Sequence, residues 1–270
     1  LSLLIVSMDA TIVNVAIPAI RADLHPSAPQ MQWVIDIYTL VLASLLMLSG
    51  ATGDRFGRRR MFQIGLTIFA AGSLLCSVAP DINTLIAARL VQGIGGSMLN
   101  PVALSIISQV FVGRVERARA LGFWGAVVGI SMALGPIVGG VLIEAISWRA
   151  VFWINLPICA VAIILTAIYV PESKSATMRD IDPIGQLLAV LSLFGLVFVL
   201  IEGPALGWTD PRIVAIIVGA TLAFLAFLRY ESRRHDPFID LRFFRSIPFA
   251  SATVTAVCVF AAWGAFLFMM

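Results

Sequence analysis

The sequence predicts an all-α polytopic membrane protein, because it is strongly apolar and its apolar residues lie in long runs separated by short polar segments. Hydrophobic residues make up 60% of the chain and charged residues 12%, about half the charged share of a typical soluble domain. A run of about 20 apolar residues can cross a bilayer as a helix. Eight such runs, and a ninth that reaches the last residue, lie at residues 1–20, 32–51, 61–79, 83–109, 119–143, 150–170, 183–202, 211–229 and 247–270.

The basic residues predict the orientation of these runs. Of the 18 Lys and Arg residues, 14 lie in the segments after the second, fourth, sixth and eighth runs, whereas Arg21, Arg149 and Arg212 lie in the opposite segments. Loops rich in Lys and Arg stay on the cytoplasmic side. We therefore expect a multi-pass protein of the cell (inner) membrane with a cytoplasmic N-terminus. The net charge of +3 is then a topology signal and indicates no nucleic-acid partner.

Nothing in the sequence supports an enzyme, a metal site or a cofactor. The two histidines, His25 and His235, lie in polar segments, and the three cysteines lie in apolar runs, where buried and inert thiols are expected. The stretch 93–96 (GIGG) resembles the start of a dinucleotide-binding loop. It lacks the third glycine and a preceding strand.

Turn-forming residues divide the chain into three parts. A polar linker at 171–180 follows the sixth run, so residues 1–170 are predicted to form an N-terminal six-helix transmembrane bundle. Residues 171–246 are predicted to hold this cytoplasmic linker, two extra transmembrane helices and a second cytoplasmic segment. Residues 247–270 are predicted to begin a further bundle. The chain opens without Met and ends inside a run, so we expect it to be a piece of a longer protein.

Asp9, in the first run, is the first candidate for chemistry, since an ionisable group at membrane depth is costly and usually functional. An unpaired carboxylate there would favour its neutral form, which suits a group that takes up and releases a proton. The alternative is a permanently ionised partner of a nearby cation that only holds helices together. The sequence leaves both interpretations open.

Arg89, in the fourth run, lies on one helical face with Gln92 or Gly93, Gly96 and Asn100. Its guanidinium keeps its charge, so it must face a carboxylate, a water-filled cavity or the outer interface. Coupling to a titrating acid and snorkelling toward the interface are the two interpretations.

Two further acids lie near the ends of runs. Asp36 comes three residues after Trp33, which is expected to mark the outer membrane interface. It is therefore either a second carboxylate of the cavity or an exposed acid at a helix start. Glu202 abuts Gly203-Pro204, which is expected to break the helix, and an acid there needs no special function.

A dense basic block separates the second and third runs and is predicted to form a tight cytoplasmic loop. Its glycine, acidic and basic residues are Gly50, Asp54, Arg55, Gly57, Arg58, Arg59 and Arg60.

The fifth run is rich in small residues, which allow close approach between membrane helices. The residues concerned are Gly122, Ser131, Gly135, Pro136, Gly139 and Gly140. Pro136 also permits a bend. This run is expected to serve as a packing face, as a hinge, or as both.

Together these features resemble the major facilitator superfamily, and within it the drug:proton antiporter family with fourteen transmembrane helices. The basic block matches the loop between the superfamily's second and third helices, and residues 9–18 and 89–95 are similar to its first- and fourth-helix motifs. The fifth run resembles the antiporter motif, with Ser131 in place of the middle glycine. The extra pair of helices and the segment 236–245 point to the fourteen-helix kind.

The resemblance implies a major facilitator-type six-helix bundle plus two linker helices, in a monomeric proton-coupled exporter of amphipathic, cationic drugs or toxic organic compounds. Its partners would be a small-molecule substrate, protons and the lipid bilayer. It implies proton coupling by Asp9 and Arg89, and a substrate cavity lined by Asn14, Gln92 and Asn100. It also implies that the basic block acts as a latch that braces helix ends in the outward-open state. An exporter of a lipid, siderophore or metabolite, and a non-transporting scaffold or receptor, are the alternatives.

Overall fold

The computed structural model describes residues 1–111, 113–174, 182–234, 243–244 and 246–269, and within these ranges the regular structure is helical, with no strand. The helices are α1 (Ser2–Leu24), α2 (Ala28–Phe56), α3 (Arg58–Ser77), α4 (Ile82–Val110), α5 (Arg114–Ala145), α6 (Ala150–Trp153), α7 (Asn155–Tyr169), α8 (Pro183–Leu206), α9 (Pro211–Glu231) and α10 (Ile247–Met269). Most of the segment 236–245 lies outside the described residues.

Eight predicted membrane crossings are confirmed, because eight spans in the described part of the chain are long and apolar enough to cross a bilayer. The short α6 and α7 together form the sixth, Ala150–Tyr169. For the predicted ninth crossing, the described residues contain an apolar helical stretch, Ile247–Ala262, that is shorter than the other eight spans. The fold class is therefore the predicted one, and the ninth crossing stays a prediction.

The basic block is not the loop that the sequence predicts. Helix α2 continues to Phe56 and α3 begins at Arg58, so Asp54 and Arg55 belong to the last turn of α2. Only Gly57 separates the two helices, with a φ of 115° that an L side chain rarely adopts. The charged residues are thus held on helical backbone.

Helix α8 also differs from the prediction at its C-terminal end. It runs through Gly203 and Pro204 and ends at Leu206, where Gly207 has a φ of 95°. Residues 207–210 form the turn, and helix α9 begins at Pro211. Asp210 caps α9 by accepting a hydrogen bond from the N–H of Arg212 at 2.8 Å.

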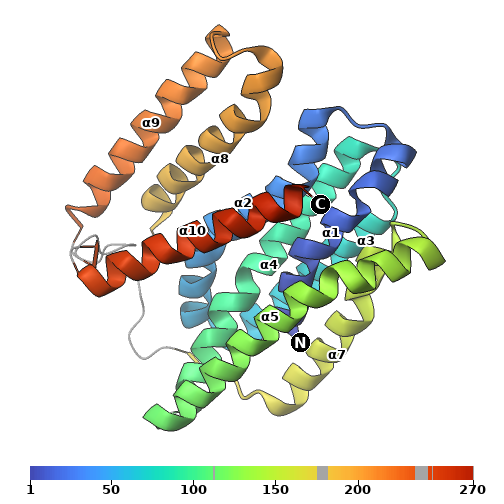
Figure 1. The fold of residues 1–270 in the computed structure, drawn as a ribbon. Coiled ribbons are helices and arrows are strands. Elements are labelled where there is room, and N and C mark those ends of the chain that lie inside the picture. Colours follow the sequence, from blue (N-terminus) through green and yellow to red (C-terminus); the bar gives the residue numbers. More distant parts are fainter. Residues whose placement is uncertain (112, 175–181, 235–242, 245, 270) are drawn as a thin grey trace.

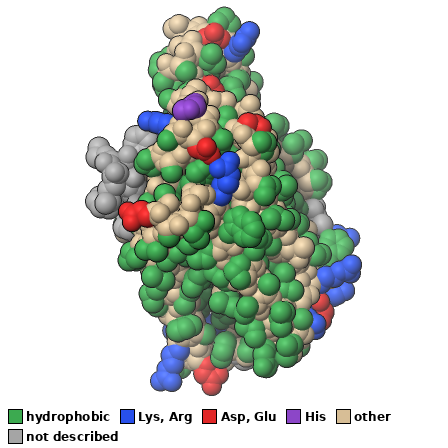
Figure 2. Space-filling view, turned by 90° about the vertical axis from the view of Figure 1, so that its right-hand side faces the viewer, with side chains coloured by type: hydrophobic (Ala, Val, Ile, Leu, Met, Phe, Trp, Pro, Cys, Tyr) green, Lys and Arg blue, Asp and Glu red, His purple; other side chains and the backbone are tan. Residues whose placement is uncertain are grey.

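Helices α1 to α7 pack together, and α8 and α9 form an antiparallel pair beside them (Figure 1). The bundle interior contains two apolar clusters, one around Ile12, Leu85 and Phe152 and one around Leu66 and Phe69. Figure 2 shows one face on which hydrophobic side chains form a broad continuous area, with charged side chains mainly toward its ends. This distribution is the one expected of a protein that spans a bilayer.

An ionic cluster closes the α8–α9 pair at the end opposite to its turn. Asp182 precedes α8 and accepts hydrogen bonds from the N–H of Gly185 at 2.9 Å and from the hydroxyl of Tyr230 at 3.1 Å, and it forms an ion pair with Arg234. Burial raises the pKa of Asp182, but the bonds from Gly185, Arg234 and Tyr230 outweigh this effect and leave the pKa below its usual value.

Candidate functional site

A buried polar cluster lies inside the bundle, where α1, α3, α4 and α7 meet. Asp9 comes from α1, Ser73 from α3, Arg89 and Gln92 from successive turns of α4, and Asn155 from the start of α7. All five side chains are buried. A polar cluster at this depth must be satisfied internally, because the bilayer core supplies no water.

Asp9 and Arg89 form an ion pair at the centre of this cluster, with side chains that are 0% and 1% exposed. The other carboxylate oxygen, Asp9 Oδ1, accepts hydrogen bonds from Gln92 Nε2 at 2.8 Å and from Asn155 Nδ2 at 3.1 Å. The premise of an unpaired carboxylate is therefore wrong. The structure pairs Asp9 with the cation that the sequence singles out on α4.

Arg89 has further partners that do not depend on Asp9. Its Nε donates to the Val34 carbonyl at 3.2 Å and its Nη1 donates to Gln92 Oε1 at 2.6 Å. The guanidinium carbon also lies 4.3 Å from the ring centre of Tyr38, a cation–π distance. Arg89 is thus held inside the bundle and does not reach the outer interface.

Asn155 and Ser73 are the members of the cluster that the sequence analysis missed. Asn155 Nδ2 donates to Ser73 Oγ at 3.2 Å as well as to Asp9, and Gln92 Nε2 donates to Ser73 Oγ at 2.8 Å. The available signal was an amide within the apolar run 150–170. Gln92 is fully buried by this network.

The remaining predicted cavity residues lie apart from the cluster. Asn14 is half-buried and donates to the Ala10 carbonyl of its own helix at 3.3 Å. Asn100 Oδ1 is buried without a hydrogen-bond partner among the described residues. Asp36 is half-buried in α2 and contributes no described hydrogen bond to the cluster.

The basic block forms a second cluster around Asp54, at the end of the bundle where α2 meets α3. Arg58 pairs with Asp54 at 2.7 Å, one helical turn away across Gly57, and its Nη1 donates to Gln109 of α4 at 2.6 Å. Ser105 of α4 lies 3.4 Å from the same carboxylate oxygen. Asp54 and Arg58 therefore tie the α2–α3 junction to the C-terminal end of α4.

Glu172, which the sequence analysis did not select, joins the same junction from the segment that follows α7. Its two carboxylate oxygens accept the backbone N–H groups of Arg59 at 3.1 Å and Arg60 at 3.2 Å, at the start of α3. The carboxylate also occupies the space beside Gly57, where an added Cβ would lie 2.7 Å from Glu172 Oε1. Arg59 and Arg60 thus contribute backbone groups here. Arg55 is exposed.

The small residues of α5 fall into two groups. Ser131, Gly135 and Gly139, spaced four apart, are buried, and the latter two lie against Thr11 and Ile12 of α1. Gly122 and Gly140 have no atom within 4 Å of an added Cβ. Pro136 lies inside one uninterrupted helix. The packing face is therefore the 131–135–139 stripe, which holds α5 directly beside the Asp9 turn of α1.

Comparison with known proteins identifies the family. The model of the Major Facilitator Superfamily matches residues 1–270. The chain belongs to this superfamily. Its membership confirms the resemblance and indicates a multi-pass membrane protein of the transporter class rather than an enzyme.

Several relatives carry names that refer to drug resistance. The chain is 37% identical over 262 residues to the multidrug resistance protein Stp of Mycobacterium tuberculosis, covering 97% of this chain and 49% of that protein. It is 40% identical to the methylenomycin A resistance protein of Streptomyces coelicolor (92% and 52% covered) and 36% identical to the multidrug efflux pump LfrA of Mycolicibacterium smegmatis (93% and 50%). The chain spans about half the length of these relatives.

Solved transporter structures share the fold. The POT family transporter PepTSo superposes with a TM-score of 0.58 at 16% identity, covering 84% of this chain and 50% of that one. A bacterial homologue of the human lysosomal transporter Spinster, inward-facing and occupied, gives 0.54 at 22% identity, with 90% and 62% covered.

Proposed function

We propose that this chain forms the N-terminal part of a proton-coupled antiporter that exports amphipathic, cationic organic molecules across the cytoplasmic membrane. The observation that carries the proposal is the fully buried Asp9–Arg89 pair inside a membrane-spanning bundle. Its desolvation is expensive, and a helix contact alone could be made by apolar residues without that cost. The names of the relatives, which refer to multidrug resistance and efflux, support the cargo class.

Asp9 is the group that carries the proton in this proposal. A proton taken up at Oδ2 replaces Arg89 there and removes the ion pair between α1 and α4. Arg89 then keeps the Val34 carbonyl, Gln92 Oε1 and the face of Tyr38. Protonation therefore loosens one helix contact without leaving a bare buried cation, and this favours movement of α1 relative to α4 in the proposed cycle.

The helix contacts around the cluster transmit this change. Asp9 lies within one helical turn of Thr11 and Ile12, against which the Gly135 and Gly139 face of α5 packs. At the cytoplasmic end, Asp54 and Arg58 act as the latch that holds the α2–α3 junction to α4. A shift of α1 thus displaces α5, which packs against it. The latch opposes separation of the α2–α3 junction from α4 on the cytoplasmic side.

The remaining parts of the proposal concern topology. Residues 1–170 form the N-terminal bundle, 171–246 the linker with its two helices, and 247–270 the first helix of a second bundle. The N-terminus is cytoplasmic, as the distribution of basic residues favours, and the transporter is a monomer in the inner membrane. Asn14 and Asn100 line the substrate cavity, and Asp36 either joins it as a second acid or is an acid near the start of α2 without a role in transport.

Gradient-driven efflux of ethidium from vesicles that contain the full-length protein tests the function. We expect efflux when a proton gradient is imposed and loss of efflux when a protonophore collapses it. Efflux that ignores the protonophore would contradict proton coupling. No ethidium movement at all would favour the other cargoes, a lipid, siderophore or metabolite, and partner binding without any flux would favour the scaffold or receptor.

A further inference from the structure

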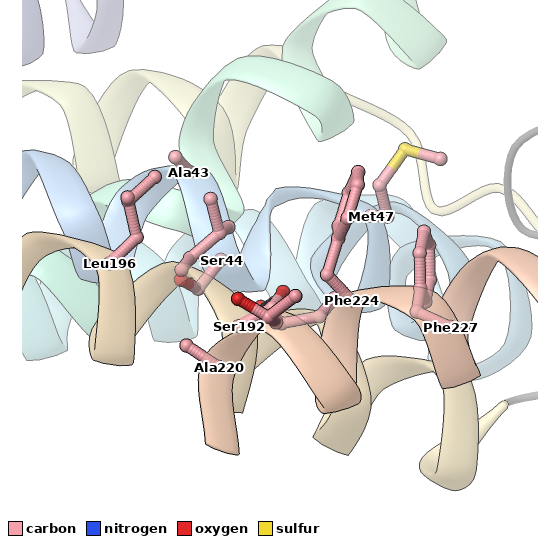
Figure 3. A pocket seen from close by; sticks show the side chains of 11 residues that line it. Ala43, Ser44, Met47, Ser192, Leu196, Ala220, Phe224 and Phe227 are labelled. Carbon is pink, nitrogen blue, oxygen red and sulfur yellow. Dashed lines mark hydrogen bonds between the residues drawn. The ribbon is translucent and has the colours of Figure 1, made fainter. Parts of the chain in front are cut away.

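A hollow of about 450 Å³ lies between α2 and the α8–α9 pair, away from the Asp9 cluster. Figure 3 shows side chains from all three helices around it, including Ala43 and Met47 of α2, Leu196 of α8 and Phe224 of α9. Small side chains on α2, α8 and α9 leave the space, which lies near mid-length of each helix. Its volume falls within the range of sites for drug-sized molecules, about 300–1,000 Å³.

Hydrogen bonds hold α8 against α2 on both sides of the hollow. Toward the outer end, Trp33 Nε1 donates to Glu202 Oε1 at 2.9 Å, and the Trp33 ring contacts Phe198. Toward the inner end, Gln186 Nε2 donates to the Ser44 carbonyl. A helix is about 10 Å wide with a pitch of 5.4 Å, so the hollow has room for about one turn. A further membrane-spanning helix therefore cannot fill it.

One polar group in the hollow lacks a partner. Ser44 is 4% exposed, lines the hollow, and its Oγ has no hydrogen-bond partner among the described residues. Ser192, which lines the same hollow from α8, donates its hydroxyl to the Ala189 carbonyl at 2.9 Å. A buried hydroxyl without a partner is unfavourable, so an occupant that supplies a hydrogen bond to Ser44 gains affinity that a hydrocarbon chain does not.

The chemistry of the walls limits the occupant further. The eleven lining residues, all of them described, include no ionisable side chain, and burying a charge among them would be costly. Leu196 and Phe224 at the rim are 53% and 49% exposed, on helices that span the membrane. The hollow is thus open on the surface of the described chain between membrane-spanning helices, at the depth where uncharged lipophilic molecules concentrate.

We propose that this hollow is a lateral binding site for an uncharged, lipophilic, drug-sized molecule that carries one hydrogen-bonding group, which meets Ser44 Oγ. It differs from the proposed export pathway, whose buried Asp9 suits protons and cations. The α8–α9 pair thereby supplies a ligand site that the six-helix bundle alone does not have.

Photoaffinity labelling of the full-length protein in lipid vesicles tests this site. The probe is a benzyl alcohol that carries a trifluoromethyl-diazirine, and peptide mass spectrometry locates its adducts. We expect adducts around residues 43–47 and 189–196 that saturate with probe concentration and are suppressed by excess benzyl alcohol. Ser44→Ala should raise the half-saturating probe concentration about two- to tenfold, which is the effect of losing one neutral hydrogen bond.

Matched controls separate the site from general contact with lipid. Ser192→Ala makes the same change in the same hollow at a hydroxyl that already has a partner, and should leave labelling within about twofold. Ala189→Phe should abolish it by filling the space. The same diazirine without its hydroxyl is the control probe, and it should label lipid-facing helices without saturation. Absent or non-saturable labelling by the benzyl alcohol probe at these residues would overturn the proposal. Equal effects of the two serine substitutions would also overturn it.

Discussion

Replacing Gly135 by alanine tests the contact between α5 and the Asp9 turn of α1. An added Cβ would lie 2.0 Å from Thr11 Oγ1 and 3.1 Å from the Ile12 nitrogen, so one helix must move by about 1 Å. Thr11 cannot easily turn away, because its side chain is branched and its hydroxyl donates to the Met8 carbonyl at 3.0 Å. Overpacking of this kind costs about 1–3 kcal/mol.

Gly122→Ala is the matched control, since it makes the same change in the same helix where nothing lies within 4 Å. The gain in helix propensity, about 1 kcal/mol, applies to both variants and cancels in their comparison. We therefore expect Gly135→Ala to be less stable than Gly122→Ala by about 1–3 kcal/mol, or about 2–4 °C in apparent Tm for each kcal/mol.

Thermal unfolding of the full-length protein, followed with a thiol-reactive fluorophore, measures this difference. The buried Cys76 and Cys159 react only when the bundle opens, and Cys258, which is exposed in this chain and lies far from both substitutions in sequence, contributes equally in the two variants. Equal Tm values for the two variants would refute the assignment of the 131–135–139 stripe as the packing face.

Three further substitutions test contacts elsewhere. Glu172→Ala removes the acceptor of two N–H groups at the start of α3, so we expect a fall in Tm equivalent to about 1 kcal/mol, and none for Lys174→Ala, which is exposed; similar shifts would contradict the contact. Asp182→Asn should destabilise the protein at neutral pH. Because the folded pKa of Asp182 is lowered, its contribution is complete above the unfolded value of about 3.9 and is lost as the pH falls through the folded pKa; a stability difference that does not begin to shrink as the pH falls below about 3.9 would exclude this origin. Asn155→Ala removes a buried donor to Asp9, a loss of about 1.5–3 kcal/mol, so gradient-driven ethidium efflux should fall at least about tenfold at equal protein content, and unchanged efflux would remove Asn155 from the site.

The crossings could be predicted from the sequence because a bilayer imposes one simple constraint, a helix of about 20 apolar residues. The same constraint marked Asp9 and Arg89, since charge within such a run has few explanations. The boundaries of the helices were less accessible. Asp54 and Arg55 were expected in a loop because they are charged, but a helix continues into the polar interface wherever its hydrogen bonds can be met, and only the φ of Gly57 ends α2.

The pairing of Asp9 with Arg89 was among the expectations, but the uncharged and acidic partners around these charges could not be predicted, because they come from elements far apart in the chain. Asn155 reaches Asp9 across 146 positions and Glu172 reaches Arg59 across 113. Both have ordinary local surroundings, and their roles follow only from helix packing. The glycines of α5 show the same limit, since composition does not reveal which of Gly122 and Gly135 faces α1.

Counterflow with Asp9→Asn tests the central claim most directly. Full-length wild type, Asp9→Asn and the control Asp210→Asn, whose new side chain still caps α9, are compared in two assays: proton-driven ethidium efflux, and exchange of ethidium across vesicles without a gradient. If Asp9 carries the coupled proton, Asp9→Asn loses driven efflux and the accompanying proton uptake but keeps exchange, and Asp210→Asn keeps both. Driven efflux and proton uptake at wild-type rates in Asp9→Asn would contradict the account.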